Sequence, residues 1–308
     1  MNNSTSYTPE EVSKILKISR FTVYEMIKRG DIPSYRIGRN MRIDAADLDT
    51  YIRNSKKHAT PQSKSPAEKQ MQESGDFIIC GQDIVLDVLT RHLEAQMPHM
   101  RFLRNYIGSM NALFALYRKA ASAATAHLWD SDSDTYNTPY VRRLLPGQHT
   151  LIFNLVYRNA GFYVAKGNPK NILDWQDLTR DTVRLINRES GAGARVLLDE
   201  MLYKLAIDSN RITGYAQEEM SHLAVASSVA RGQADVAVGI EKVALQISGV
   251  DFIPLKQERY DIVIRQDDVE KPAFQALLSI LKSQAFFDEV SGMGGYDLSQ
   301  TGKLMAQL

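Results

Sequence analysis

The sequence predicts an α/β protein composed of a small N-terminal unit and a larger domain, and three observations support this prediction. Residues 6–53 contain short helix patterns interrupted by a hairpin pattern. From Asp76 onward, short apolar strands alternate with amphipathic helices. A stretch rich in Ser, Lys and Pro separates the two patterns. We therefore expect domains at residues 1–55 and 76–308, joined by a linker at 56–75.

The first helix is predicted from its start signal and its apolar spacing. Thr8 can cap the free amides of a helix, and Pro9 suits the first helical position. Val12, Ile15 and Leu16 then fall on one face at helical spacing. We expect a short amphipathic helix that begins after Thr8.

A second helix follows after a tight turn. Ser19 is its expected N-cap, residues 20–29 form its body, and Gly30 ends it. Two short helices joined in this way form a helix-turn-helix, whose second helix can enter a DNA major groove.

The segment after Gly30 predicts a hairpin and a third helix. Tyr35, Ile37, Met41 and Ile43 alternate around a turn at residues 38–40. Asp44 is then placed to cap a helix from Ala45 to Ile52. We expect DNA contacts from both the second helix and the hairpin: Ser19, Arg20, Thr22, Tyr24, Lys28, Arg36, Arg39, Asn40 and Arg42.

Residues 6–53 resemble the excisionase-type winged helix of the MerR-like group. The shared features are the T-P-E-E-V opening, S-R-x-T-V-Y, I-P-x-x-R-I-G-R and D-L-x-x-Y-I. The resemblance implies that this unit is a winged helix-turn-helix that binds a double-stranded DNA operator. Because one small head offers few base contacts, we expect a homodimer or higher homo-oligomer.

The charge distribution agrees with DNA contact at one end of the chain. Residues 1–75 contain 13 Lys and Arg against 9 Asp and Glu, a net charge of +4. The whole chain has 37 against 36, so the remainder has 24 against 27, a net charge of −3.

The composition argues against a disulfide-bonded protein, a membrane protein and a metalloprotein. A single cysteine, Cys80, excludes an internal disulfide and fits a reducing compartment. No apolar run reaches membrane-spanning length, and the N-terminus lacks a signal-peptide core. The six histidines show no metal-ligand spacing. We expect a cytoplasmic protein with no metal, no cofactor and no membrane partner.

The larger domain is predicted to be a parallel sheet with helices on both faces. Strands are expected at 76–81, 102–107, 126–129, 151–158, 161–165, 184–186, 236–238 and 262–265, with helices at 84–95, 112–121 and 196–205. In such sheets, ligands bind beyond the carboxyl ends of the strands, where helix N-termini converge.

Three predicted strand-to-helix junctions contain glycine and small polar residues suited to holding an anion. They are residues 81–83, 108–111 and 187–195. We expect Asp83, which would repel an anion, to cap its helix instead. The alternative for Gly191–Gly193 is that these small residues only allow close helix packing. The candidate ligand-binding residues are Gln82, Ser109, Asn111, Ser190, Gly191, Ala192, Gly193, Arg195 and Tyr215.

Residues 76–308 resemble the molybdate-binding-protein-like domain, which is a periplasmic-binding-protein-like fold. The shared motifs are N-R-x-S-G-A-G-A-R and the segments 136–141, 214–240 and 294–302. The resemblance implies two α/β lobes around a ligand cleft: lobe 1 at about 76–162 and 265–308, lobe 2 at about 163–264. The chain would cross between them near 161–166 and 258–265.

Together the two resemblances imply a one-component transcription regulator that senses tungstate or molybdate, and not an enzyme. The alternatives left open are a regulator of formate, another carboxylate or a molybdopterin-related ligand, and an enzyme of molybdenum-cofactor biosynthesis. No credible nucleophile–base pair supports the enzyme. For His127, the sequence favours a hydrogen-bonded structural histidine over a ligand contact.

Overall fold

The computed structural model describes residues 6–16, 19–29, 31–38, 40–57 and 75–308. The chain forms two compact units, Met1–Ser65 and Pro66–Leu308. Residues 58–74 of the predicted linker, and Gly30 at the predicted end of the second helix, lie outside the described residues.

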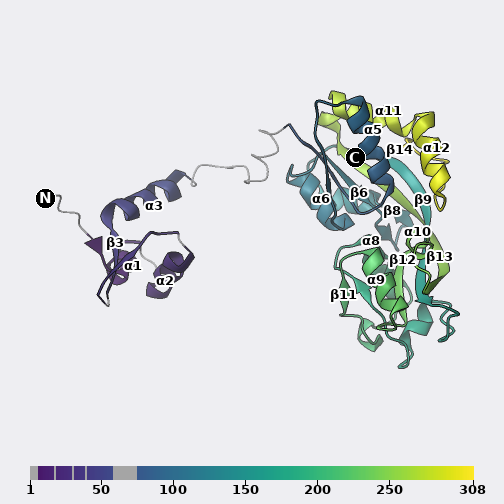
Figure 1. Cartoon of the computed structure of the whole chain (residues 1–308), viewed down its shortest axis with the longest axis horizontal. Helices are drawn as coiled ribbons and strands as arrows, with labels where there is room; N and C mark the ends of the chain where they lie inside the picture. The colour runs from purple at the N-terminus through teal and green to yellow at the C-terminus, as the bar shows by residue number, and fades with distance from the viewer. Residues whose placement is uncertain (1–5, 17–18, 30, 39, 58–74) are drawn as a thin grey trace. The chain divides into compact units, whose positions relative to one another are not determined.

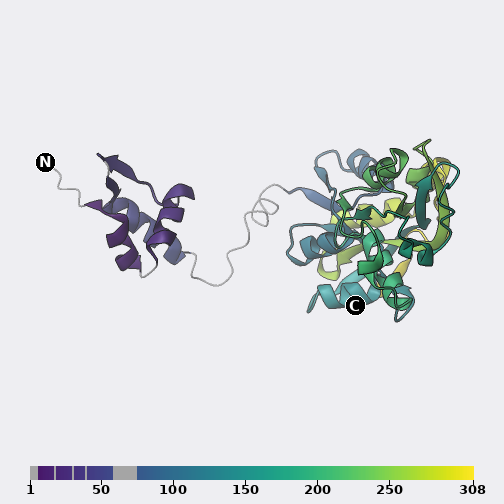
Figure 2. The ribbon, with the colours of Figure 1, turned by 90° about the horizontal axis from the view of Figure 1, so that it is seen from below.

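The described part of the N-terminal unit contains three helices and a three-stranded antiparallel sheet of order β1-β3-β2 (Figures 1 and 2). Its elements are β1 (Ser6–Tyr7), α1 (Pro9–Leu16), α2 (Arg20–Arg29), β2 (Tyr35–Ile37), β3 (Asn40–Asp44) and α3 (Ala45–Lys57). The helix-turn-helix and the hairpin are therefore confirmed, and α3 extends beyond the predicted Ile52. A small core lies between them: Val12, Val23, Met26, Ile32, Ile43 and Leu48.

The predicted starts of α1 and α2 are confirmed by side-chain hydrogen bonds. Thr8 Oγ1 accepts from the Glu11 amide at 3.2 Å, and the Glu11 carboxylate accepts from the Thr8 amide at 2.8 Å. Ser19 Oγ accepts from the Thr22 amide at 3.1 Å, which fixes the start of α2.

The C-terminal unit is built on a seven-stranded sheet of order β12-β9-β13-β6-β4-β5, with β14 paired to β9. Its strands are β4 (Phe77–Cys80), β5 (Phe102–Asn105), β6 (Ala123–Ala126), β9 (Thr150–Ala165), β12 (Val236–Ile240), β13 (Val250–Arg265) and β14 (Leu304–Gln307). Within this sheet β4 pairs parallel with β5 and β6, whereas β9, β12, β13 and β14 join antiparallel. The predicted wholly parallel sheet is therefore wrong, because helical crossovers connect only its first three strands in sequence.

Helices cover this sheet, and short strands lie beside it. The helices are α5 (Val85–Gln96), α6 (Ser109–Tyr117), α7 (Thr138–Leu144), α8 (Gly193–Lys204), α9 (His222–Ala230), α10 (Glu241–Ala244), α11 (Pro272–Leu281) and α12 (Gln284–Met293). The short strands are β7 (Trp129–Asp130), β8 (Thr135–Tyr136), β10 (Asn187–Arg188) and β11 (Glu218–Glu219). Short 3-10 turns occupy Trp175–Thr179, Ser209–Arg211 and Gln266–Asp268. Residues 184–186 form only an isolated bridge between Leu185 and Val236, not the predicted strand.

Two long paired strands, β9 and β13, run through both lobes of this unit (Figure 1). The predicted strands at 151–158 and 161–165 are one strand. Gly161 lies inside this strand, where a Cβ would overlap the Ile253 carbonyl of the paired strand.

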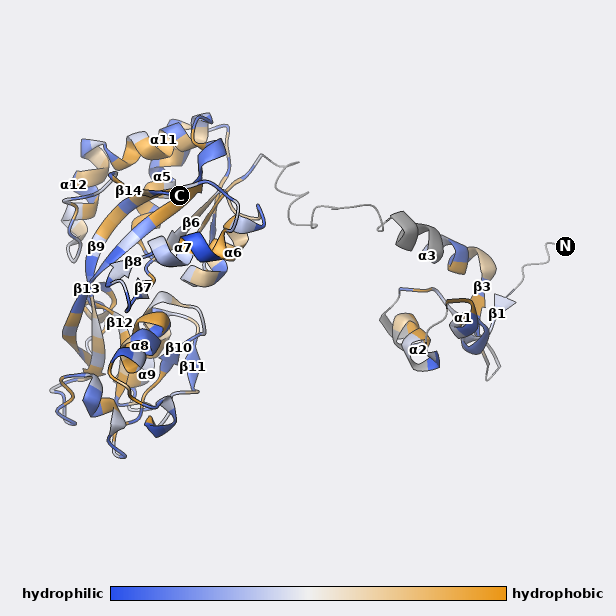
Figure 3. Ribbon diagram, turned by 180° about the vertical axis from the view of Figure 1, so that it is seen from behind, coloured by the Kyte–Doolittle hydropathy of each residue, from blue (hydrophilic) through white to orange (hydrophobic). Residues whose placement is uncertain are grey.

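The apolar cores lie on either side of a polar middle section of these strands. Leu155 and Val156 belong to the core of one lobe, whereas Ala160 and Phe162 belong to the core of the other. The hydrophilic middle of β13 lies between them (Figure 3). On β9 the chain thus changes lobes between Val156 and Ala160, a few residues before the predicted crossing. None of the helices in the described part of the chain has the length and apolar character needed to cross a membrane.

Candidate ligand-binding hollow and DNA-binding surface

A hollow lies between the two lobes of the C-terminal unit. The hollow is narrow: its cavity volume is about 20 Å³, and the empty space in and around it, open solvent included, is about 320 Å³. Lobe 1 contributes Gly81, Gln82, Asp83, Ile107, Gly108, Ser109, Thr125 and His127 to its lining. Lobe 2 contributes Arg188, Ala192, Gly193 and His222, and the two connecting strands contribute Arg158 and Tyr260. We call this set the inter-lobe hollow.

The starts of two helices from opposite lobes meet at the inter-lobe hollow. Gly108 is the N-cap of α6, and Ala192 is the N-cap of α8. The first amides of a helix have no acceptor within the helix and attract negative charge. A Cβ at Gly108 would lie 3.0 Å from Ala192 Cα, and the Met110 amide donates to the Gly191 carbonyl at 3.0 Å. The lobes are therefore in contact here.

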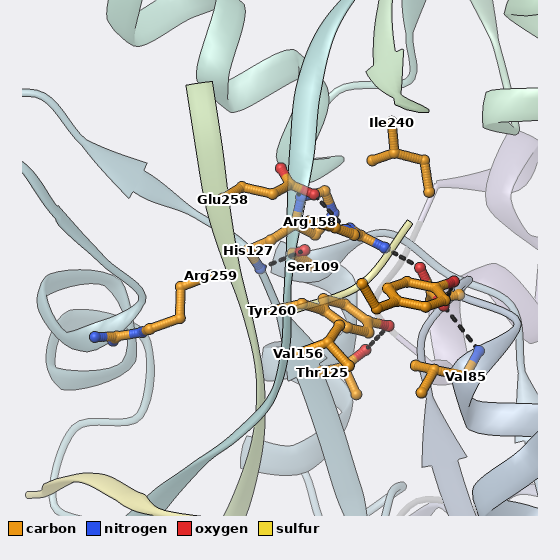
Figure 4. Close-up of polar contacts among 12 residues, drawn as sticks. Val85, Ser109, Thr125, His127, Val156, Arg158, Ile240, Glu258, Arg259 and Tyr260 are labelled. Atoms are coloured by element: carbon orange, nitrogen blue, oxygen red, sulfur yellow. Dashed lines mark hydrogen bonds and ion pairs between the residues drawn. The ribbon is translucent and has the colours of Figure 1, made fainter. Parts of the chain in front are cut away.

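Arg158 is a buried cation in the wall of the inter-lobe hollow (Figure 4). Its Nε donates to Glu258 at 2.6 Å, its Nη1 pairs with Asp83, and its guanidinium lies 4.2 Å from the centre of the Tyr260 ring. Burial alone would lower the pKa of Arg158, but Glu258 and Asp83 raise it, so it stays charged.

Both carboxylates around Arg158 have further partners. His127 Nδ1 lies 2.9 Å from Glu258. Burial alone would raise the pKa of Glu258, but His127 and Arg158 lower it to about 2. Asp83 accepts from the Val85 amide at 2.8 Å and from the Tyr296 hydroxyl at 2.7 Å. Asp83 thus accepts from the first amide of α5, but Ile84 is the N-cap residue, and Asp83 lines the hollow instead of only capping its helix.

Arg188, at the end of β10, connects the two lobes across the inter-lobe hollow. Its Nη2 donates to Gln82 of lobe 1 at 2.8 Å. The same guanidinium donates to both oxygens of Glu189 at 2.8 and 2.9 Å. Arg188 can therefore hold lobe 2 against lobe 1 while facing a ligand.

His222, the first residue of α9, is 8 % exposed and lines the same hollow. Its Nδ1 is fully buried without a hydrogen-bond partner among the described residues. Burial first, and then Arg188 and Arg158, lower the pKa of His222 well below its usual value. The ring is therefore neutral at neutral pH.

The structure brings some of the predicted ligand-binding residues together at the inter-lobe hollow. Gln82, Ser109, Ala192 and Gly193 line it. The side chains of Asn111 and Ser190 are exposed and do not line it. Gly191 contacts the other lobe through its carbonyl and likewise is not in the lining.

Arg195 and Tyr215 do not reach the inter-lobe hollow, and the reason is local. Arg195 donates to Asp199, one helical turn along α8, and to Glu218, each at 3.0 Å. It also lies over the Tyr215 ring at 4.3 Å, and the Tyr215 hydroxyl donates to Asp199 at 2.6 Å. These contacts hold both side chains at the side of α8.

The sequence did not single out Arg158, Arg188, Glu258 or His222. Arg188 lies in the quoted N-R motif directly after a strand, so its position was a usable signal. Arg158 and Glu258 are paired in register on β9 and β13, a pairing that no local pattern indicates. For His127, the predicted hydrogen-bonded role is confirmed, and its ring also lines the inter-lobe hollow.

On the N-terminal unit, most described DNA-binding candidates are exposed. They are Ser19 just before α2, Arg20, Thr22 and Tyr24 on α2, and Arg36 on β2, while Arg42 on β3 is half-buried. Arg20 lies 3.8 Å from Glu10 in an exposed ion pair, which holds it only weakly. Arg39 and the side chains of Lys28 and Asn40 lie outside the described residues.

Comparison with known proteins assigns both units. Residues 90–282 match the family model described as a PBP superfamily domain, and residues 6–56 match that of a helix-turn-helix domain. The chain thus belongs to the PBP superfamily, with a DNA-binding helix-turn-helix domain fused to a ligand-binding domain. Within the described residues, no group of three His, Cys, Asp or Glu side chains could hold a metal ion.

Individual relatives agree with this assignment. The chain is 42% identical over 312 residues to the uncharacterized protein YvgK of Bacillus subtilis (strain 168), with all of both chains covered. It is 53% identical over 113 residues to an uncharacterized Clostridium pasteurianum protein from the 5' region of a ferredoxin gene, which covers 37% of this chain and 100% of that one.

Solved structures agree on the fold. A Clostridium perfringens protein described as a phosphate ABC transporter substrate-binding protein, with bound phosphate, matches with a TM-score of 0.54 and 14% identity over 72% of this chain and 98% of that one. A mutant of ArgBP from T. maritima matches with a TM-score of 0.52 and 11% identity over 74% and 98%.

Proposed function

We propose that this protein is a one-component transcription regulator whose two-lobed domain captures a small anion and thereby controls DNA binding by the helix-turn-helix. The observation that supports this proposal most is the inter-lobe hollow, because donors from both lobes line it. Such a regulator acts where the DNA is, which agrees with the cytoplasmic location that the sequence predicts.

The donors of the hollow favour an anion with several acceptor oxygens. They are the first-turn amides of α6 and α8, the Ser109 hydroxyl, and the guanidinium groups of Arg158 and Arg188. Tungstate or molybdate is our leading ligand, on the basis of the family resemblance of residues 76–308. Formate, another carboxylate or a molybdopterin-related molecule is the alternative.

Ligand capture can influence the fold through the contacts between the lobes. A ligand held by α6 and α8 adds to the Met110–Gly191 and Arg188–Gln82 contacts. It would therefore favour the closed arrangement over an open one. We propose that this difference changes DNA affinity in a homodimer, since two heads are needed for a strong operator contact.

Titration calorimetry on the full chain tests the ligand class. Molybdate, tungstate, sulfate, phosphate and formate are titrated separately at pH 7.5. We expect micromolar or tighter binding of molybdate or tungstate, and at least tenfold weaker binding of formate. Tight formate binding without oxyanion binding would favour the carboxylate alternative, and no binding of any anion would contradict the proposal.

A further inference from the structure

His222 is a buried histidine in the wall of the inter-lobe hollow. It lines the hollow from the lobe 2 side, and its ring centre lies 6.3 Å from that of His127. Its Nδ1 has no partner among the described residues although it is fully buried. A buried nitrogen without a partner costs free energy, and a ligand oxygen in the hollow would supply the missing partner.

The charges around His222 do not favour an anion by themselves. Arg158 pairs with Asp83 and Glu258, and Arg188 pairs with Glu189. The cluster therefore contains two cations and three carboxylates. Protonation of His127, the partner of Glu258, would only make this cluster neutral. A dianion entering the hollow therefore needs additional positive charge nearby.

Charged or titratable groups lie on the elements that contact α9 or in the lining of the hollow. They are Arg158 on β9, Arg188 and Glu189 at β10, Glu219 on β11, Glu258 on β13, His127 after β6, Asp83 before α5, and Lys242 on α10. Lys242 donates its Nζ to the Met293 carbonyl and lines a wider outer chamber, not the inter-lobe hollow itself. His222 lines both spaces, so it is placed to respond to an entering ligand.

We infer that His222 is a ligand-binding residue that takes a proton from solvent when the hollow captures an anion. The imidazolium then donates an N–H to a ligand oxygen and supplies the missing positive charge. This inference rests on the proposed anion-binding function, and it narrows the ligand to fully ionised oxyanions with an oxygen within reach of α9. In the ligand-free protein the ring is neutral, because burial and the two arginines disfavour its charged form.

Calorimetry of molybdate binding in two buffers with different ionisation enthalpies measures this proton directly. Full-length protein is titrated at pH 7.5 in Tris and in HEPES, and the difference in observed enthalpy gives the number of protons taken up. We expect about one proton per molybdate. Repetition from pH 6.5 to 8.5 should show affinity falling about tenfold per pH unit, which is the linkage expected for one proton.

Three variants identify the group that takes up the proton. His222→Gln should bind molybdate at least tenfold more weakly and with no proton uptake. His127→Gln tests whether the other histidine of the hollow takes up the proton instead of His222. His92→Gln is the matched control, because His92 pairs with Glu289 outside the hollow and should leave both the affinity and the proton count unchanged.

The outcomes separate this inference from the proposed function. Absence of binding by the native chain to every anion would contradict the proposed function and this inference with it. Molybdate binding without proton uptake, or uptake that persists in His222→Gln, would overturn the inference alone. If folded His222→Gln does not bind molybdate, this result supports a contact between His222 and the ligand. The pH dependence of molybdate affinity in the native chain then shows whether a proton is taken up.

Discussion

Ser109 and Ser190 belong to two segments that the sequence predicted to hold an anion, and the structure places their side chains differently. Ser109 is buried and lines the inter-lobe hollow, whereas Ser190 is exposed outside it. We expect Ser109→Ala to weaken anion binding about tenfold or more, because a hydrogen bond to a charged group contributes about 1.5–3 kcal/mol.

Ser190→Ala is the matched control for that measurement and should change the dissociation constant less than twofold. Both variants are titrated with molybdate in separate calorimetric runs under identical conditions. Equal losses in the two variants would show that the ligand binds at the loop surface and not in the inter-lobe hollow.

Arg158 matters for stability as well as for binding. Replacing it with methionine leaves Asp83 and Glu258 buried without their cation. We expect Arg158→Met to lower the free energy of unfolding by about 3–5 kcal/mol at pH 7.5. Urea denaturation followed by tryptophan fluorescence measures this, because Trp129 and Trp175 both lie in the core of lobe 2.

Arg195→Met provides the comparison for Arg158→Met. Its partners Asp199 and Glu218 are about 40 % exposed and can be solvated after the change. We expect a cost of about 1 kcal/mol or less. A loss from Arg195→Met as large as that from Arg158→Met would contradict the importance we give to the buried cluster.

The sequence predicted Ser109 and Gly193 of the hollow but not its charged residues. It also predicted Ser190 and Gly191, which do not line the hollow. Ser109 and Gly193 follow apolar segments at recognisable junctions. Arg158 and Glu258 are 100 positions apart, and only the register of β9 with β13 brings them together. Arg195 has the right chemistry in the right loop, but Asp199 on the next helical turn binds it.

At the scale of elements, the start of α8 lies directly against lobe 1. A Cβ at Gly193 would overlap the His127 ring, which Glu258 holds in place. We expect Gly193→Ala to push the lobes apart and to weaken molybdate binding at least tenfold, as measured by calorimetry.

Gly292 in α12 offers a matched glycine for this test, since a Cβ there meets nothing within 4 Å. Gly292→Ala should leave molybdate binding unchanged. If Gly193→Ala also binds normally, the approach of α8 to lobe 1 is not needed for ligand capture.

The elements of the N-terminal unit could be predicted well because their signals are local. Thr8 and Ser19 form the capping contacts that their positions indicated. In the larger domain, helix starts such as that of α5 were also close to prediction. The mixed sheet was not predicted, because strands β9 and β13 pair over distances that no window of sequence covers.

At the scale of the whole molecule, the pH dependence of stability follows from His222. Its folded pKa is depressed below the ordinary 6.5, so the unfolded chain binds a proton that the folded chain does not. The contribution of neutral His222 to the free energy of unfolding should therefore be complete above pH 6.5. It should decrease as the pH falls below 6.5, by at most about 1.4 kcal/mol per pH unit.

Urea denaturation between pH 7.5 and 5 isolates this effect, because Glu258, with its pKa of about 2, loses its charge only at lower pH. His222→Gln should flatten the slope. An equally steep slope in His222→Gln would assign the pH dependence to other groups.

We propose that the two units act together, so that anion capture in the C-terminal domain changes DNA binding by the helix-turn-helix. The most direct test is fluorescence anisotropy of the full chain on a DNA site selected from random sequence, with and without saturating molybdate. Arg20→Ala on the exposed face of α2 serves as the control for specific DNA contact.

We predict that molybdate changes the dissociation constant for the selected DNA at least fivefold, within the usual range of coupling between sites. Arg20→Ala should bind that DNA about tenfold more weakly in either condition. If molybdate binds the chain but leaves its DNA affinity the same, the account of this protein as an anion-responsive regulator is contradicted.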